Sequence, residues 1–297
     1  MKGTPYFYGT FGNYSVAWFH MPSQGTCNPD STLLCGKVIE EVAPIAVVMV
    51  GIAFGANENK QKIGDILVSR IILNYDSRRV RSNSTEYKEI PKEVGFQLSN
   101  AFSTNASEWQ YPFKTNVRDK YKVFSGAMLT GSALIDDYDF RKKLLTDFSE
   151  YKPIGGEMEA YGIYAQCRLN RVGEWIIVKS ICDWAYDKQN PQKNEWQKTA
   201  ADSAVNFCYY VFSLRGGNDK GIFDDLANVP VLNAIDHSSV SEEQFKRILE
   251  MLQIQAPQRQ SDVDQARKAG HVAGWKLLRK ILATNADLIT LVTPFFR

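Results

Sequence analysis

Two kinds of apolar pattern alternate along the first part of the chain. Continuous runs of β-branched and other apolar residues, as at 45–50 and 175–181, are typical of parallel strands that helices cover on both faces. Apolar residues spaced three and four apart, as at 30–41, are typical of amphipathic helices. The same patterns predict two short strands joined by a Gly-Asn turn within 4–21, strands at 66–73 and 121–129, and helices at 91–100, 140–148, 157–169 and 194–214.

The order of these elements indicates the fold class. Strands that alternate with helices favour a mostly parallel sheet, because parallel neighbours need crossover connections that usually contain a helix. We therefore expect an α/β domain over residues 1–215, with three layers (α/β/α) around a mostly parallel, mixed sheet.

The residue pattern changes after residue 214. Residues 215–221 are rich in turn formers, and Pro230 follows shortly after, so we expect a linker over 216–231. Beyond it, Ser241 precedes apolar residues at helical spacing, which predicts a capped amphipathic helix over 241–254. Two further helices are expected at 263–282 and 287–292, so residues 232–297 should form a small all-α module.

Composition and charge narrow the class of protein. The chain has 297 residues, 44% of them hydrophobic and 23% charged, which is ordinary for a folded domain. The formal charge is only +2 and the basic residues are scattered, so we expect no nucleic-acid partner. The longest apolar run, 43–56, is too short to span a bilayer, and the N-terminus lacks the pattern of a secretory signal. We therefore expect no membrane association and a cytoplasmic location.

Cysteine and histidine spacing gives no sign of a metal or disulfide. The five cysteines include no Cys-x-x-Cys pair, and the three histidines lie far apart. We accordingly expect no metal and a reducing compartment.

Three short segments carry candidate chemistry. The first, Val-Gly-Ile-Ala-Phe-Gly at 50–55, follows a predicted strand, and ligands of open α/β sheets bind outside the carboxyl ends of the strands. Its glycines let the main chain approach a ligand closely. A tight turn between a strand and a helix is an equally simple interpretation of this segment.

The second segment, Gly-Gly-Glu-Met-Glu-Ala at 155–160, places Glu157 and Glu159 on either side of Met158 at the start of a predicted helix. The helix dipole favours carboxylates at this position without any ligand. A glutamate beside a methionine also suits a sugar, because the carboxylate accepts from vicinal hydroxyls while the thioether packs on the ring.

The third segment delivers Asp183 to the end of the buried strand at 175–181, with Trp184 next to it. An aspartate at a strand end can simply cap a turn. Against an aromatic wall its pKa is expected to rise, and a neutral carboxyl group can protonate a leaving nitrogen atom.

Together these segments resemble a known family. Over residues 6–214 the order of motifs is similar to that of the nucleoside phosphorylase/nucleosidase superfamily, which includes purine nucleoside phosphorylases and methylthioadenosine/adenosylhomocysteine nucleosidases. The motifs are GIAFG (51–55), KIGDILVS (62–69), TGSALID (130–136), GGEMEAYGIYA (155–165) and VKSICDWA (178–185).

The resemblance implies cleavage of the N-glycosidic bond of a purine nucleoside or nucleotide, by water or by phosphate as co-substrate, with no cofactor. It assigns Asp183 to purine N7 and Glu159 to the ribose 2′ and 3′ hydroxyls. It also implies a homo-oligomer. The remaining substrate contacts that we expect are Met158 and Glu157 at the sugar, Ile52, Ala53 and Phe54 along the sugar and base, and Leu134, Ile135 and Trp184 around the base.

The sequence also departs from the family pattern. Family members begin with a further strand that supplies a phosphate-binding glycine or a water-positioning glutamate, and residues 1–3 are too short to form it. The family's Ser-Gly-Asp motif here reads Thr130-Gly131-Ser132. The alternative hypothesis is therefore a catalytically impaired protein that binds nucleosides or serves as a scaffold through its helical tail. Arg78 to Arg81 form a basic run that is either solvated or a substitute phosphate site.

The C-terminal module resembles the effector-associated and death-like helical domains that bacteria attach to enzymes of antiphage defence. The resemblance rests on 241–254 and on the helical pattern. It implies a protein partner and a role as a defence effector. A helical cap that packs on the α/β domain explains the same pattern equally well.

Overall fold

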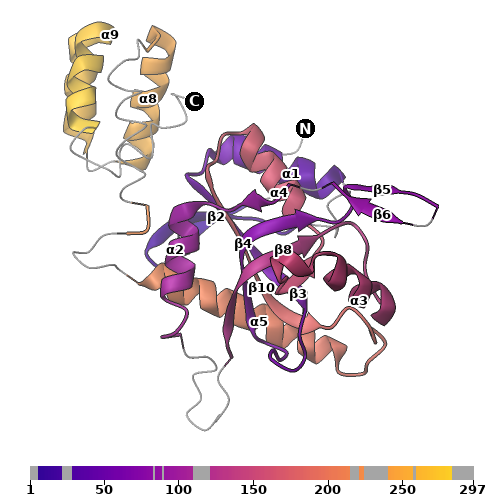
Figure 1. Cartoon of the computed structure of the whole chain (residues 1–297). Coiled ribbons are helices and arrows are strands. Elements are labelled where there is room, and N and C mark those ends of the chain that lie inside the picture. Colours follow the sequence, from indigo (N-terminus) through magenta and orange to yellow (C-terminus); the bar gives the residue numbers. More distant parts are fainter. Residues whose placement is uncertain are drawn as a thin grey trace. The chain divides into compact units, whose positions relative to one another are not determined.

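The computed structural model describes residues 6–21, 29–82, 84–88, 90–109, 121–214, 221–223, 240–256 and 259–282. It divides into two compact units, Met1–Arg215 and Gly216–Arg297. Figure 1 shows the first unit as a sheet with surrounding helices and the second as helices only.

The central sheet of the first unit has six strands in the order β10-β3-β9-β8-β4-β7. Parallel pairs join β10 to β3, β4 to β8 and β8 to β9, while β3–β9 and β4–β7 are antiparallel. The expected mixed α/β architecture is therefore confirmed. The strands are β3 (Ala46–Gly55), β4 (Ile66–Asn74), β7 (Lys92–Glu93), β8 (Val123–Thr130), β9 (Gly155–Glu157) and β10 (Glu174–Asp183).

Strand β10 is paired on both sides. Val178 lies opposite Val50 of β3 in the parallel direction and opposite Val68 of β4 in the antiparallel direction. The five strands β10, β3, β9, β8 and β4 thus form a closed ring of pairings rather than an open sheet. Closure explains why nearly every residue of β10 is buried, and why its sequence reads as a continuous apolar run.

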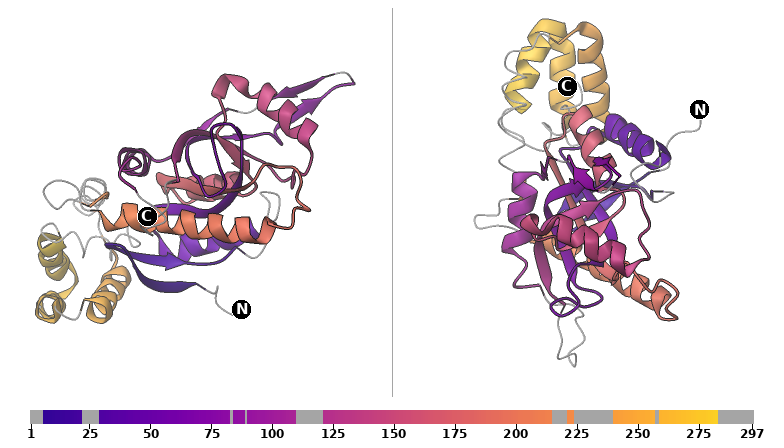
Figure 2. Two further views of the ribbon diagram at one scale, coloured as in Figure 1. Left: turned by 90° about the horizontal axis from the view of Figure 1, so that it is seen from below. Right: turned by 45° about the vertical axis from the view of Figure 1, so that its right-hand side comes forward.

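Helices cover this sheet. Helix α5 packs on β10 and β3, and α1 packs on α4; α5 is the long orange helix of the first unit in Figure 1, and Figure 2 shows it along one side of the sheet. The core combines β-branched strand residues such as Ile177 with small and apolar helix residues such as Ala160 and Cys167. The helices are α1 (Pro29–Val42), α2 (Phe96–Thr104), α3 (Tyr138–Asp147), α4 (Ala160–Leu169) and α5 (Lys193–Ser213), with a 3₁₀ turn at Ser149–Tyr151.

The predicted elements that fall within the described residues are confirmed in type, but some of their boundaries are wrong. The expected helix at 157–169 begins only at Ala160, because Gly155–Glu157 forms β9. The expected helix at 91–100 begins at Phe96, after the two-residue strand β7. The short hairpin β5 (Arg78–Val80) and β6 (Thr85–Tyr87) was not expected, because it contains few apolar residues.

The hairpin β1 (Phe7–Phe11) and β2 (Tyr14–Trp18) is joined by the expected Gly-Asn turn. Gly12 has a φ of 60°, and the Asn13 backbone N–H donates to Phe212 O at 2.8 Å, which anchors the turn to the end of α5. In the described part of the chain β1 and β2 pair only with each other. The edge of β3 that does not face β10 pairs only through Phe54 and Gly55, so most of this edge has no strand partner among the described residues.

The second unit contains α8 (Glu242–Gln255) and α9 (Gln260–Leu282) around a core of its own. The Ser241 side chain accepts from Gln244 N, and the Gln244 side chain accepts in return from Ser241 N, which is the expected cap. Helix α9 is interrupted at Gly270, which has a φ of 78°. The expected linker at 216–231 lies almost entirely outside the described residues, and the expected helix at 287–292 lies wholly outside them. No helix in the described ranges is both long and apolar enough to cross a membrane.

Candidate active site

A cavity of about 450 Å³ lies beside β3 and β10, within the size range of sites for small ligands. Its walls come from both strands, from the turn between β9 and α4, from the loop after β8, from the segment after β2 and from the start of α5. The sequence-predicted residues that it brings together are Asp183, Glu159, Met158, Glu157, Ile52, Ala53, Phe54, Leu134 and Ile135.

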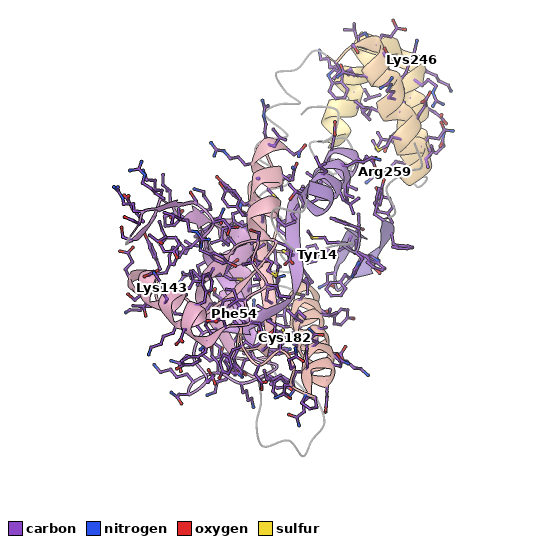
Figure 3. All side chains as sticks on the ribbon, turned by 90° about the vertical axis from the view of Figure 1, so that its right-hand side faces the viewer. Tyr14, Phe54, Lys143, Cys182, Lys246 and Arg259 are labelled. Atoms are coloured by element: carbon purple, nitrogen blue, oxygen red, sulfur yellow. The ribbon has the colours of Figure 1, made fainter. Side chains whose placement is uncertain are left out.

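Asp183 reaches the cavity because β10 is irregular at its end. The pairing of β10 with β3 shifts between Ile181 and Asp183, so that Asp183 lies opposite Phe54. A bulge of this kind re-aims a side chain, and here both Cys182 and Asp183 line the cavity. Figure 3 shows Phe54 and Cys182 on these neighbouring strands.

The Asp183 carboxylate is held by three donors. Its Oδ1 accepts from Ala185 N at 2.8 Å, and its Oδ2 accepts from Lys188 Nζ at 2.9 Å. The Cys182 thiol lies 3.4 Å from Oδ2. Burial, with the nearby carboxylate of Asp183, raises the pKa of Cys182, so this thiol stays protonated and can donate. The side chains of Asp183 and Lys188 are each 13% exposed, and both line the cavity.

Trp184, which we expect around the base, is not among the residues that line the cavity. A Cβ added to Gly55 would lie 2.5 Å from the Trp184 ring, so the ring packs on the backbone of β3 instead. The group that faces the Asp183 carboxylate is the Lys188 ammonium rather than an indole ring.

The two glutamates flanking Met158 have different surroundings. Glu157 is 4% exposed, and its carboxylate accepts from the N–H groups of Glu159 and Ala160 at 2.9–3.1 Å, which caps the start of α4. Glu159 has its Oε2 3.1 Å from Lys179 Nζ. The capping interpretation therefore fits Glu157, whereas the Glu159 carboxylate pairs with Lys179 in the cavity wall.

Lys179 is the cation of this cluster. It lies on β10 with a 4% exposed side chain, and its Nζ is 3.1 Å from Glu159 and 3.5 Å from Glu157. Burial by itself lowers the pKa of Lys179, but the carboxylates of Glu159 and Glu157 outweigh it and raise the pKa, so the ammonium stays charged. Burial raises the pKa of Glu157, against the opposing effect of Lys179. One ammonium thus sits between two buried carboxyl groups.

The apolar part of the cavity surrounds this polar cluster. Phe54 is 9% exposed. Its ring has room because Gly156 carries no side chain, since a Cβ there would lie 2.4 Å from the ring. Ile135 is 6% exposed, whereas Leu134 is 61% exposed at the rim. The loop that carries both is held by a hydrogen bond from the Tyr75 hydroxyl to Ala133 O at 3.2 Å.

Two of the motifs have structural functions. In the KIGD segment the buried Asp65 carboxylate accepts from Lys62 N at 2.9 Å and from Lys122 N at 2.7 Å, which ties two loops together. In the Thr-Gly-Ser segment the Ser132 N–H and hydroxyl both donate to Asp76 at 2.7 Å. The basic run near Arg78 forms the exposed hairpin β5–β6, where Arg79 and Arg81 pair with Glu86, away from the cavity lining.

Sequence reasoning missed several polar residues of the cavity, namely Lys179, Lys188, Lys193, Gln197 and His20. Lys179 had a usable signal, because it is the one charged residue inside the apolar run at 175–181, and lysine is rarely buried without a partner. The others lie in or beside polar segments, where a charged residue is unremarkable. Over the ranges that the structure describes, no group of three or more His, Cys, Asp or Glu side chains could hold a metal ion.

Comparison with known proteins agrees with this architecture. The Phosphorylase superfamily matches this chain over residues 1–214. The chain is 25% identical over 225 residues to a death domain-containing ATP nucleosidase of Amphimedon queenslandica. This match covers 69% of this chain and 41% of that protein. It is 27% identical over 167 residues to the 5′-methylthioadenosine/S-adenosylhomocysteine nucleosidase of Staphylococcus epidermidis, covering 56% of this chain and 69% of that protein.

Solved structures share the fold. The nucleosidase of that name from Neisseria meningitidis, in complex with methylthio-immucillin-A, superposes with a TM-score of 0.58 at 17% identity, over 70% of this chain and 85% of the other. The futalosine hydrolase of Helicobacter pylori superposes with a TM-score of 0.56 at 18% identity, over 71% and 84%. The superfamily match over residues 1–214, carried by the fold that holds Asp183 and Glu159 in one cavity, places the chain in the Phosphorylase superfamily.

Proposed function

We propose that this protein cleaves the N-glycosidic bond of a purine nucleoside or nucleotide. The observation that carries the proposal is the presence of Asp183 and Glu159, with Met158 beside Glu159, in the wall of one cavity of about 450 Å³. The relatives that match this chain are named as nucleosidases, which supports the same reaction class.

The two carboxyl groups suit the charges that develop as the bond breaks. The departing purine gains electrons, and a hydrogen bond or proton from the pair of Asp183 and Lys188 to N7 stabilises it. The ribosyl group becomes positively charged, and Glu159 accepts from its 2′ and 3′ hydroxyls while adding a negative charge nearby. Met158 supplies an apolar surface for the sugar ring. The bond from C1′ to the purine nitrogen breaks, and a water or phosphate oxygen forms the new bond at C1′.

The names of the relatives favour water as the attacking group. The assay that decides is incubation of the full chain with a panel of purine nucleosides and nucleotides, with and without phosphate, followed by mass spectrometry of the sugar product. Free ribose or its 5′-substituted form identifies hydrolysis, and a 1-phosphate identifies phosphorolysis. Nucleoside binding without release of base would instead support a binding or scaffolding protein.

The variant Asp183→Asn tests the assigned acid. Because an amide cannot donate a carboxyl proton to N7, we expect kcat to fall by at least about a hundredfold. Asp187→Asn is the matched control: Asp187 is exposed in the same loop, lies outside the cavity lining and has a φ of 55°, which asparagine accepts. Equal turnover of Asp183→Asn and wild type would remove Asp183 from the mechanism.

The helical unit suggests how such an activity is controlled. We propose that it recruits a protein partner or further copies of the chain, as in an effector of bacterial defence. Its separate core around Phe245, Ile248 and Trp275 and its polar outer surface support this role. The matched ATP nucleosidase is named for a death domain, although this chain spans only 41% of its length.

A further inference from the structure

The cavity contains polar groups that the proposed chemistry does not use. Asp183 and Lys188 are assigned to the base, and Glu159, which pairs with Lys179, is assigned to the ribose diols. Tyr75, Glu157 and Cys182 already have the hydrogen bonds described above, so the polar side chains that remain in the cavity wall are those of Lys193, Gln197 and His20. A purine nucleoside bound in this way also presents its 5′ carbon for recognition.

The carboxylates and lysines of the cavity wall are equal in number, but their ion pairs leave one lysine out. Its carboxylates are those of Glu157, Glu159 and Asp183, and its lysines are Lys179, Lys188 and Lys193. Lys179 is paired with the two glutamates and Lys188 with Asp183. For Lys193, no carboxylate lies within ion-pair distance among the residues that the structure describes.

The position of Lys193 is fixed by the fold. It is the first residue of α5, and Gln197 follows four residues later, so the two side chains lie on one face of the helix. Both are half-buried, and α5 packs on β3 and β10, the strands that carry the rest of the cavity. His20 adds a further donor from the exposed segment after β2.

An apolar 5′ substituent fits this wall poorly. A methylthio group, as in the named substrate of the matched bacterial nucleosidases, would displace water from the Lys193 ammonium without replacing its hydrogen bonds, and an unpaired cation is costly to desolvate. A phosphate oxygen supplies both the charge and the acceptors that the Lys193 and Gln197 side chains require.

We propose that Lys193 and Gln197 form a binding site for the 5′ phosphate of the substrate, so that this protein acts on purine nucleotides in preference to nucleosides. This inference rests on the proposed N-glycosidic cleavage and assigns its substrate class. It makes Lys193 a specificity-determining residue.

The test compares base release from adenosine, methylthioadenosine, AMP and ATP by the full chain. We expect kcat/KM for the better of the two nucleotides to exceed that for either unphosphorylated nucleoside by at least tenfold. In Lys193→Met this ratio should fall at least tenfold, and Lys193→Arg should restore most of it, because arginine keeps the charge. Lys198→Met is the matched control, since Lys198 is exposed on the same helix and outside the cavity lining, and it should keep the wild-type ratio.

Two results would overturn the assignment. The first is a wild-type preference for adenosine or methylthioadenosine, and the second is a nucleotide preference that Lys193→Met leaves intact. If no compound releases base, the proposed cleavage fails, and calorimetric binding of ATP against adenosine then tests the phosphate site alone. Equal affinities for the two, or an ATP preference that persists in Lys193→Met, would reject the site even then.

Discussion

At the scale of single residues, the buried Lys179 determines the polarity of the site. Its ammonium lies between Glu157 and Glu159, and all three side chains are at most 12% exposed. Gly51 of β3 leaves the space that this requires, since a Cβ there would lie 3.1 Å from Lys179 Nζ. One cation therefore pairs both with Glu157, which caps a helix, and with Glu159, which lines the cavity.

Replacing Lys179 with methionine should destabilise the first unit by about 3–5 kcal/mol, the usual cost of leaving a buried charge without its partner. The loss should be smaller at pH 5 than at pH 8. Without the ammonium, the pKa of the buried Glu157 rises further above its unfolded value, so the folded state binds more protons and stability falls as the pH rises through this range.

Denaturant unfolding at both pH values measures this effect. Lys143→Met is the control, because Lys143 is 58% exposed in an i,i+4 pair with Asp147, and such surface pairs contribute little. A destabilisation of Lys179→Met that is the same at both pH values would contradict the assigned electrostatics.

At the scale of elements, the short strand β9 positions Met158 and Glu159, the residues that we propose bind the sugar. It pairs with β3 through Gly155 and Gly156 and with β8 on its other side, and α4 begins directly after Glu159. Both glycines are required by close packing, because a Cβ on Gly155 would lie 2.3 Å from the Phe54 carbonyl oxygen. The placement of Met158 and Glu159 therefore depends on the fit of β9 between two longer strands.

The substitution Gly156→Ala tests this dependence. Its methyl group would meet the Phe54 ring at 2.4 Å, so either the ring or β9 must move, and we expect KM to rise by about tenfold or more together with a loss of about 1–3 kcal/mol in stability. The control is Gly173→Ala, where an added Cβ meets nothing within 4 Å. Steady-state kinetics and thermal unfolding of both variants provide the comparison, and unchanged kinetics in Gly156→Ala would show that β9 does not position the site.

At the scale of the whole molecule, the chain is organised as two units with separate cores. The cavity and every residue assigned to the chemistry belong to the first unit. The helical unit buries its own cluster, including Phe245, Leu249 and Leu278. This division is what a catalytic unit with a separate recruitment unit requires.

Deletion of residues 216–297 should leave the first unit folded and able to release base from the substrate. If the helical unit brings copies of the chain together, the shortened chains should no longer associate. Any increase in base release that this association causes should be lost as well. Light scattering, circular dichroism and the base-release assay of the full and shortened chains measure these properties side by side. Unfolding of the shortened chain, or association and activation equal to those of the full chain, would contradict the division of roles.

Much of the local structure was predictable, because the spacing of apolar residues reflects backbone geometry directly. The buried strand that ends at Asp183 and the helix that begins at Lys193 are examples. Each is long enough for its apolar spacing to show a clear pattern. The boundary of α4 was not predictable, because a β9 of three residues is too short to show a period. Motif order also indicated that Asp183 and Glu159 act together, and the shared cavity agrees, while their roles in the reaction stay predictions.

The sequence alone therefore determined the class of the fold, the order of its elements and the two carboxyl groups to examine. Only the tertiary structure decided that β10 closes a ring, that Trp184 turns away from Asp183, and that Lys179, Lys188 and Lys193 share the cavity. The reason is physical: periodicity depends on neighbours along the chain, whereas the pairing of Lys179 with Glu159, 20 positions apart, depends on how β10 and the start of α4 pack. Such contacts arise from strand register and side-chain direction, which no local pattern specifies.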